Sequence, residues 1–233
     1  MPCTLPASLA DAAVCRGSFH AVLGGEAGEA VFVDFSAALQ KAQEEGRILT
    51  ASLFRYENHL FFYAEGLNRP FTPQGLCPAL DAALLPWPPA LGEAAPRPWA
   101  AMQPYFYHDV PTTAADWQQG RCPQRRRGRI ALLPPDKWCS YMEHHLRIVT
   151  EGLVEGDRWH LICVQEGVLF SYLEEPRTNV NIKHRPGAHS PELDAWIAAD
   201  PESHFARFTP EQKAHPDSGH NFVFLPRIAG TED

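Results

Sequence analysis

The stretch from Pro135 to Glu155 places a histidine and a tyrosine at a spacing that suits proton transfer. His145 follows Tyr141 by four residues, so on a helix both side chains project from one face. Apolar residues such as Trp138 and Ile148 recur on that face, which predicts that it lies against the interior. Imidazole has an ordinary pKa of about 6.5 and exchanges protons near neutral pH. His145 is therefore a hydrogen-bonded core residue, an acid/base group lining a pocket, or a metal or haem ligand.

The elements around this helix predict a compact α+β unit. The helix start is marked by Pro134-Pro135 and by Asp136, which can cap it. Apolar runs bounded by Gly and Pro predict the remaining elements. In order, we expect strand 130–133, helix 135–155, a hairpin of strands 159–164 and 168–174, helix 191–199 and strand 222–225.

The first half of the chain repeats this order. Three segments match in sequence: 16–23 with 127–133, 60–65 with 169–174, and 78–82 with 191–195, at offsets of 111, 109 and 113. Three matches in the same order indicate an internal repeat. The first copy is expected as strand 19–23, helix 32–45, strands 47–56 and 59–65, helix 77–85 and strand 105–107.

A βαββαβ order is typical of ferredoxin-like units, whose helices cover one face of an antiparallel sheet. We therefore predict an α+β protein of two fused ferredoxin-like repeats that form an intramolecular dimeric α/β barrel. The predicted parts are an N-terminal tail (1–15), a degenerate first repeat (16–110), a linker (111–126) and a second repeat (127–233). The first repeat has Phe35 and Val31 at the positions of His145 and Tyr141, so one site per chain is expected.

Residues 127–227 resemble the L-rhamnose mutarotase family. The resemblance is carried by the run Pro135-Asp136-Lys137-Trp138-Cys139-Ser140-Tyr141-Met142-Glu143-His144-His145, by the strand ending Leu169-Phe170-Ser171-Tyr172-Leu173-Glu174, and by the closing strand Phe222-Val223-Phe224-Leu225-Pro226. Departures from the family include His144 in place of its arginine, Val149 in place of a tryptophan, and Phe205-Ala206 in place of two adjacent tryptophans.

This resemblance implies a cofactor-free mutarotase that interconverts the anomers of a monosaccharide. His145 would carry the proton and Tyr141 would orient the imidazole or the sugar. The resemblance also implies substrate contacts from His144, Trp159, Tyr172 and Phe205. Proton carriers of this kind contribute roughly 10²–10⁴-fold each. The insertion at residues 177–190 is either a lid with polar contacts or a surface loop.

Charge and cysteine content limit the alternatives. A net charge of −8 argues against nucleic-acid binding, and no segment approaches the roughly 20 apolar residues of a membrane span. Six cysteines without a Cys-x-x-Cys pair indicate neither zinc nor disulfides, so a reduced cytoplasmic protein, monomer or homodimer, is expected. The basic run at 125–129 is a solvated linker or an anion site, and Glu174 and Glu175 are a solvated strand end or pocket carboxylates.

Two further functions stay open on the sequence. Fused ferredoxin-like pairs resemble haem proteins of the chlorite dismutase type, which need an axial histidine facing an apolar cavity; His145, His160 and His204 are candidates. The chain could also be an inactive scaffold or binding protein, since the resemblance is incomplete.

Overall fold

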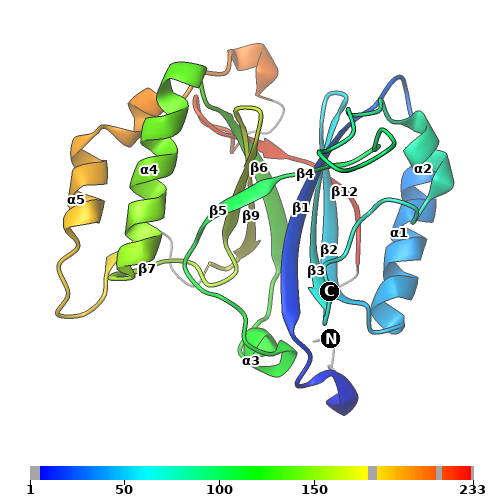
Figure 1. Ribbon diagram of the computed structural model, residues 1–233, viewed down its shortest axis with the longest axis horizontal. Helices are drawn as coiled ribbons and strands as arrows, with labels where there is room; N and C mark the ends of the chain where they lie inside the picture. Colours follow the sequence, from blue (N-terminus) through cyan, green and yellow to red (C-terminus); the bar gives the residue numbers. More distant parts are fainter. Residues whose placement is uncertain (1–5, 178–182, 214–216, 232–233) are drawn as a thin grey trace. The chain divides into compact units, whose positions relative to one another are not determined.

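The computed structural model describes residues 6–177, 183–213 and 217–231. The chain forms two compact units (Figure 1). Unit 1 comprises residues 1–102, 111–122 and 226–233, and unit 2 comprises residues 103–110 and 123–225. Both are α+β units with one five-stranded antiparallel sheet each, in agreement with a ferredoxin-like fold. Within the described residues, no helix combines the length and the apolar character needed to cross a membrane.

Unit 1 follows the element order predicted for the first repeat. Its main elements are β1 (Val14–Val22), α1 (Glu29–Glu44), β2 (Ile48–Tyr56), β3 (His59–Leu67), α2 (Pro78–Ala83) and β4 (Ala100–Ala101). The sheet order is β12-β2-β3-β1-β4, in which β12 is Arg227–Gly230. Helix α1 buries Phe32, Phe35, Leu39 and Ala42, a spacing of three and four residues that makes one continuous apolar stripe. This stripe packs on a sheet face that includes Phe62 and Ala64.

Unit 2 repeats the pattern with its own strands. Its main elements are β5 (Gln103–Tyr107), β6 (Arg125–Leu132), α4 (Pro135–Glu151), β7 (Val154–Glu155), β8 (Leu161–Gln165), β9 (Val168–Glu175), β10 (Lys183–His184), α5 (Pro191–Ala198) and β11 (Val223–Leu225). The large sheet has the order β11-β6-β9-β8-β5, and β7 pairs separately with β10. Helices α4 and α5 lie side by side (Figure 1).

Helix α4 begins at Pro135 as predicted, but its C-terminal boundary and the role of Asp136 differ from the sequence prediction. The helix ends at Glu151, because Gly152 takes a left-handed conformation with φ of 66° that glycine adopts without strain. Asp136 lies inside the first turn instead of capping the helix, where its charge still favours the helix N-terminus. Trp138 is 41% exposed, so the prediction that it faces inward is wrong. The inward face consists of Tyr141, His145 and Ile148.

The hairpin of β8 and β9 agrees with the prediction. Gln165 pairs with Val168, and the two residues between them, Glu166 and Gly167, have φ values of 50° and 78°. Positive φ at both central positions is the geometry of the tight turn that matches strand twist. The hairpin therefore fixes the register of the two strands that lie beneath α4.

The edge strands differ from the prediction for both repeats. The strand containing Tyr105 and Tyr107 follows the first repeat in sequence, but as β5 it pairs with β8 of unit 2. At the other end of the chain, β12 (Arg227–Gly230) pairs with β2 of unit 1. Each sheet thus takes its fifth strand from the segment that follows the other repeat.

The segment predicted as a linker is structured. Helix α3 (Ala114–Gln118) is capped by Thr113, and it buries Trp117 in unit 1. The basic run, predicted to be solvated, forms the first part of β6, where Arg126 lies opposite Glu174 and Arg125 opposite Glu175. Strand pairing therefore places the positive charges of this run beside acidic residues.

Both units bury a tyrosine–glutamate pair, on β3 in unit 1 and on β9 in unit 2. In unit 1 the Tyr63 hydroxyl donates to Glu65 at 2.6 Å, and Arg121 donates to the same carboxylate through two nitrogens at 2.7 and 3.0 Å. In unit 2 the Tyr172 hydroxyl donates to Glu174, also at 2.6 Å. Glu174 is 2% exposed, so the prediction of a solvated strand end is wrong for this residue.

Candidate functional site

Unit 2 contains a cavity of about 420 Å³ between its helices and its sheet. This volume falls in the usual range for small-molecule sites, roughly 300–1,000 Å³. The lining combines aromatic rings with a few ionisable groups. The aromatic and histidine members are Phe106, His108, Tyr141, His145, His160, Trp196, Phe205 and Phe222, and the charged members are Arg129, Asp157, Arg177 and Glu202.

His145 lies in the aromatic part of this cavity. Its ring centroid is 4.2 Å from that of Tyr141, and 4.7 Å from those of Phe106 and Trp196. Trp196 comes from α5, whose start is fixed because the Ser190 hydroxyl accepts a hydrogen bond from the backbone of Leu193. Because these rings surround it, the His145 side chain is buried, and the residue is 4% exposed.

The hydrogen bonding of His145 determines which nitrogen is available to a ligand. Nδ1 lies 2.9 Å from the backbone carbonyl of Tyr141, one helical turn earlier. A carbonyl can only accept, so Nδ1 carries the proton and Nε2 keeps a lone pair. Burial lowers the pKa of His145 to about 4, which makes the imidazole neutral at physiological pH. His145 is therefore a hydrogen-bond acceptor in the cavity.

Tyr141 supports this arrangement as a neutral phenol. Burial raises the pKa of Tyr141 to about 12, and its ring also contacts those of Trp196 and Phe205, at 5.3 and 5.2 Å. Tyr105 of β5 packs edge-on against Tyr141 at 6.0 Å. The pair predicted from the sequence, His145 and Tyr141, thus lies together, faces inward and lines a hollow.

Arg129 brings a half-buried positive charge to the same cavity. It lies on β6, and its guanidinium carbon is 4.4 Å from the ring centroid of Phe222. No hydrogen bond or ion pair joins its guanidinium to any other residue in the described part of the chain, and its Nε is buried. Burial lowers the pKa of Arg129 to about 10, and Arg177 contributes to the shift. The side chain remains charged at neutral pH.

A second histidine approaches from the segment after β5. His108 packs its ring edge-on against Phe106 at 4.8 Å. A Cβ added to Gly156 would lie 2.0 Å from the His108 ring, so only glycine allows this approach. Burial lowers the pKa of His108 to about 4. Nearby, the buried Asp157 pairs with Arg177 at 3.4 Å, which neutralises both charges.

The structure separates the other residues predicted to bind substrate. Phe205 lines the cavity together with His145 and Tyr141. His144, Trp159 and Tyr172 are not part of its lining. His144 contacts Trp196 from one side, with ring centroids 5.4 Å apart, and Trp159 is buried in a turn before β8. Tyr172 lies on the sheet face opposite to α4, because side chains alternate along β9 and Leu169 packs with the α4 core.

The corresponding region of unit 1 is filled with side chains. Phe35 is fully buried, and it packs against Phe62 and Trp99 with ring centroids 5.8 and 6.3 Å away. This packing agrees with the prediction that the first repeat lacks the acid/base pair. The histidine and its cavity belong to unit 2.

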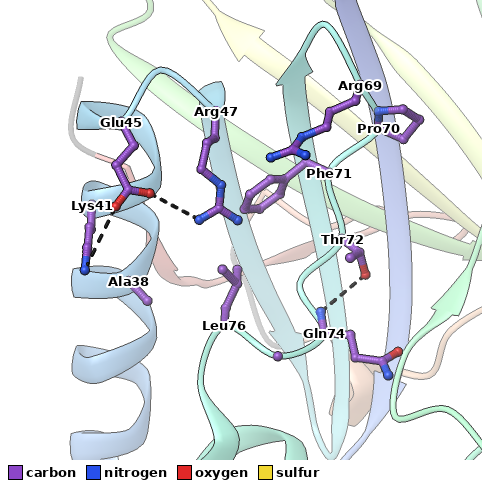
Figure 2. Close-up of a pocket in the computed structure, with 11 residues that line it drawn as sticks. Ala38, Lys41, Glu45, Arg47, Arg69, Pro70, Phe71, Thr72, Gln74 and Leu76 are labelled. Atoms are coloured by element: carbon purple, nitrogen blue, oxygen red, sulfur yellow. Dashed lines mark hydrogen bonds and ion pairs between the residues drawn. The ribbon is translucent and has the colours of Figure 1, made fainter.

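Unit 1 has a different hollow of about 490 Å³ beside the C-terminal end of α1 (Figure 2). Glu45 pairs with Lys41 at 3.9 Å and with Arg47 at 3.3 Å, and Arg69 also lines the hollow. Arg47 also covers the ring of Phe71 at 5.3 Å. These pairs are solvent-exposed and contribute little, so this hollow is a solvated surface groove.

Part of the insertion at 177–190 lies outside the described residues, including Asn179 and Asn181. In the described part, β10 pairs with β7, and His189 pairs with Asp194 at 2.9 Å. Neither His184 nor His189 lines the cavity.

Sequence reasoning missed three important residues of the site. Arg129 belongs to the basic run at 125–129. The sequence left two interpretations of this run open, a solvated linker and an anion site. His108 lies in a segment whose pairing partner was predicted in the other repeat. Trp196 occupies a buried position of the second helix, and apolar periodicity alone does not distinguish a core position from a cavity wall.

Comparison with known proteins gives no family assignment. No protein-family model matches the chain, and no curated protein does. Two solved structures described as "putative monooxygenase" align with it. One is from Lactobacillus acidophilus (7% identity, 94% of this chain and 96% of that chain, TM-score 0.37). The other is from Fusobacterium nucleatum (10% identity, 94% of both chains, TM-score 0.40).

These findings correct the prediction of a sugar mutarotase. The similar structures found are described as monooxygenases and not as isomerases. Three of the four residues expected to bind the sugar also lie outside the cavity lining. The predicted isomerase activity and role in carbohydrate metabolism are therefore unsupported as well.

Proposed function

We propose that unit 2 binds a small, planar, largely apolar organic molecule that donates a hydrogen bond to Nε2 of His145. The observation that carries this proposal is the state of His145, a neutral imidazole whose Nδ1–H is committed to the Tyr141 carbonyl. A buried acceptor of this kind favours a ligand with an O–H or N–H group.

The aromatic walls support a flat ligand. Phe106, Trp196 and Phe205 surround the imidazole and Tyr141. Aromatic rings attract one another at centroid distances of roughly 4.5–7 Å in edge-on or offset arrangements. An aromatic alcohol satisfies both features of the site, since its ring contacts the walls and its hydroxyl donates to Nε2.

For the architecture, we propose that the two units are diverged copies of one ferredoxin-like repeat, fused as a dimeric α/β barrel. The equivalent strand orders support this proposal: β2-β3-β1-β4 in unit 1 and β8-β9-β6-β11 in unit 2. The pairing registers add that Arg16 lies opposite Glu65 and Arg126 opposite Glu174. Equivalent residues of β1 and β6 are thus 110 positions apart, whereas the sequence match of 16–23 with 127–133 has an offset of 111.

Calorimetric titration with 2-naphthol and 2-methoxynaphthalene tests the binding proposal. The methyl ether has the same ring system but no hydroxyl proton. We expect 2-naphthol to bind about 5- to 10-fold more tightly, the value of one net hydrogen bond. The variant His145→Phe should remove this preference, because phenylalanine cannot accept the bond, and Phe35 shows that this fold buries phenylalanine on the corresponding helix.

The variant His189→Phe is the matched control, since the His189 side chain is 75% exposed and lies outside the cavity. It should retain the preference for 2-naphthol. Absence of binding by any compound of this class, or an unchanged preference in a folded His145→Phe protein, would contradict the proposal.

A further inference from the structure

The most unusual group in unit 2 is the Arg129 guanidinium. The side chain is half-buried and lines the cavity, and its Nε is buried without a hydrogen-bond partner among the described residues. A charged group that loses water without gaining a partner is destabilised, and arginine at such positions usually pairs with a carboxylate or phosphate. In the described part of the chain, the Arg129 guanidinium packs on the face of Phe222 and forms no ion pair.

The acidic residues of the cavity do not neutralise Arg129 by contact. Asp157 is paired with Arg177. Glu202 is exposed, and its carboxylate accepts a hydrogen bond from the Asn221 amide. The charge of Glu202 raises the pKa of Arg129, but Arg129 and Glu202, both described residues, form no ion pair with each other. The positive charge of Arg129 is thus available to a ligand that enters the cavity.

Phe222 also orients the guanidinium. A ring that packs on a guanidinium at 4.4 Å covers part of its face, and the N–H donors point outward along the edge of the plane. Two parallel N–H groups match the two oxygens of a carboxylate, and such forked pairs are the strongest hydrogen bonds that proteins form with organic anions.

We propose that the ligand of unit 2 is a hydroxy acid, bound as its carboxylate anion, with the carboxylate on Arg129, the hydroxyl donating to Nε2 of His145 and the apolar body between Phe106, Trp196 and Phe205. This inference rests on the proposed function, because it specifies the chemical class of the ligand of the same cavity. Arg129 acts as the specificity residue: it distinguishes an aromatic or apolar acid from a neutral compound of the same shape.

Calorimetric titration with 6-hydroxy-2-naphthoate and its neutral analogue 6-(hydroxymethyl)-2-naphthol at pH 7.5 tests the inference, because both compounds keep the ring hydroxyl and differ in the carboxylate. We expect 6-hydroxy-2-naphthoate to bind about 10- to 100-fold more tightly, the range for a charge-assisted hydrogen bond. Arg129→Gln should remove that difference. Arg207→Gln removes the same charge from an exposed position of unit 2, and it should leave both affinities unchanged.

The possible outcomes separate this inference from the proposal on which it rests. If the neutral alcohols bind and 6-hydroxy-2-naphthoate binds no better than they do, the carboxylate inference fails and the binding proposal stands. If 6-hydroxy-2-naphthoate is preferred but Arg129→Gln and Arg207→Gln weaken it equally, the preference reflects general charge and the role of Arg129 is refuted. If no naphthalene compound binds, both proposals fail. Circular dichroism spectra of the variants establish that each one is folded.

Discussion

Replacement of Arg121 with methionine is expected to lower the free energy of unfolding by about 3–5 kcal/mol, the cost of leaving a buried charge without its partner. The Glu65 side chain is fully buried, and Arg121 is 2% exposed and holds the carboxylate through two nitrogens. Burial alone would raise the pKa of Glu65, but Arg121 outweighs it and holds the pKa below its usual range. Without Arg121, the carboxylate must take up a proton or remain charged in the core.

Urea denaturation of the purified protein measures this loss. Lys41→Met is the control, because it removes one positive charge from an exposed pair at 3.9 Å in the same unit. It should cost less than about 0.5 kcal/mol. The double variant Arg121→Met/Glu65→Leu should be more stable than Arg121→Met alone, since neither charge is then left unpaired. A loss below about 1 kcal/mol for Arg121→Met would show that the carboxylate finds another partner.

Acidification from pH 7.5 to 4.5 is expected to destabilise the fold partly through His145. Its pKa is about 6.5 in the unfolded chain and about 4 in the fold, so between these values the unfolded state binds more protons. Stability is then complete above about pH 6.5 and is lost as the pH falls toward 4. For His145 this loss amounts to about 2–3 kcal/mol by pH 4.5. His108, which is half-buried with a pKa also lowered to about 4, adds a smaller amount.

The measurement is the free energy of unfolding at several pH values for the wild type and for His145→Phe. The variant cannot take up this proton, so its curve should be flatter by about 2 kcal/mol across the same interval, whatever its stability at neutral pH. His189→Phe should follow the wild type, since His189 is exposed. Parallel curves for wild type and His145→Phe would mean that His145 titrates in the fold as it does in the unfolded chain.

The local elements could be predicted from the sequence because their signals are local. The α4 helix has an apolar stripe with proline at its start, and the β8–β9 hairpin has a glycine in its turn. The inward orientation of Tyr141 and His145 followed from their four-residue spacing together with the apolar residues on the same helix face. The helix end was misplaced by several residues, because Leu153 continues the apolar spacing although Gly152 has already ended the helix.

Long-range pairing could not be predicted in the same way. Nothing in the sequence near Tyr105 indicates that this strand joins unit 2, since the choice depends on an edge supplied by β8. The same limit explains the charged residues. Arg126 and Glu174 each look solvated in isolation, and only the register of β6 and β9 places them opposite each other. The place of Arg129 in the cavity lining was not predicted, because Arg129 belongs to a basic run with Arg125, Arg126 and Arg127.

The pairing of β5 with β8 and of β12 with β2 has a consequence for dividing the chain. A fragment of residues 1–122 contains β5, Phe106 and His108 but lacks β12, and the complementary fragment 123–233 contains α4 and β12 but lacks β5. Each piece would carry an edge strand whose sheet is on the other piece, and an unpaired sheet edge of its own that favours association. Co-expressed fragments should therefore recover aromatic-acid binding only when they reassemble, which makes the ligand a reporter of complementation.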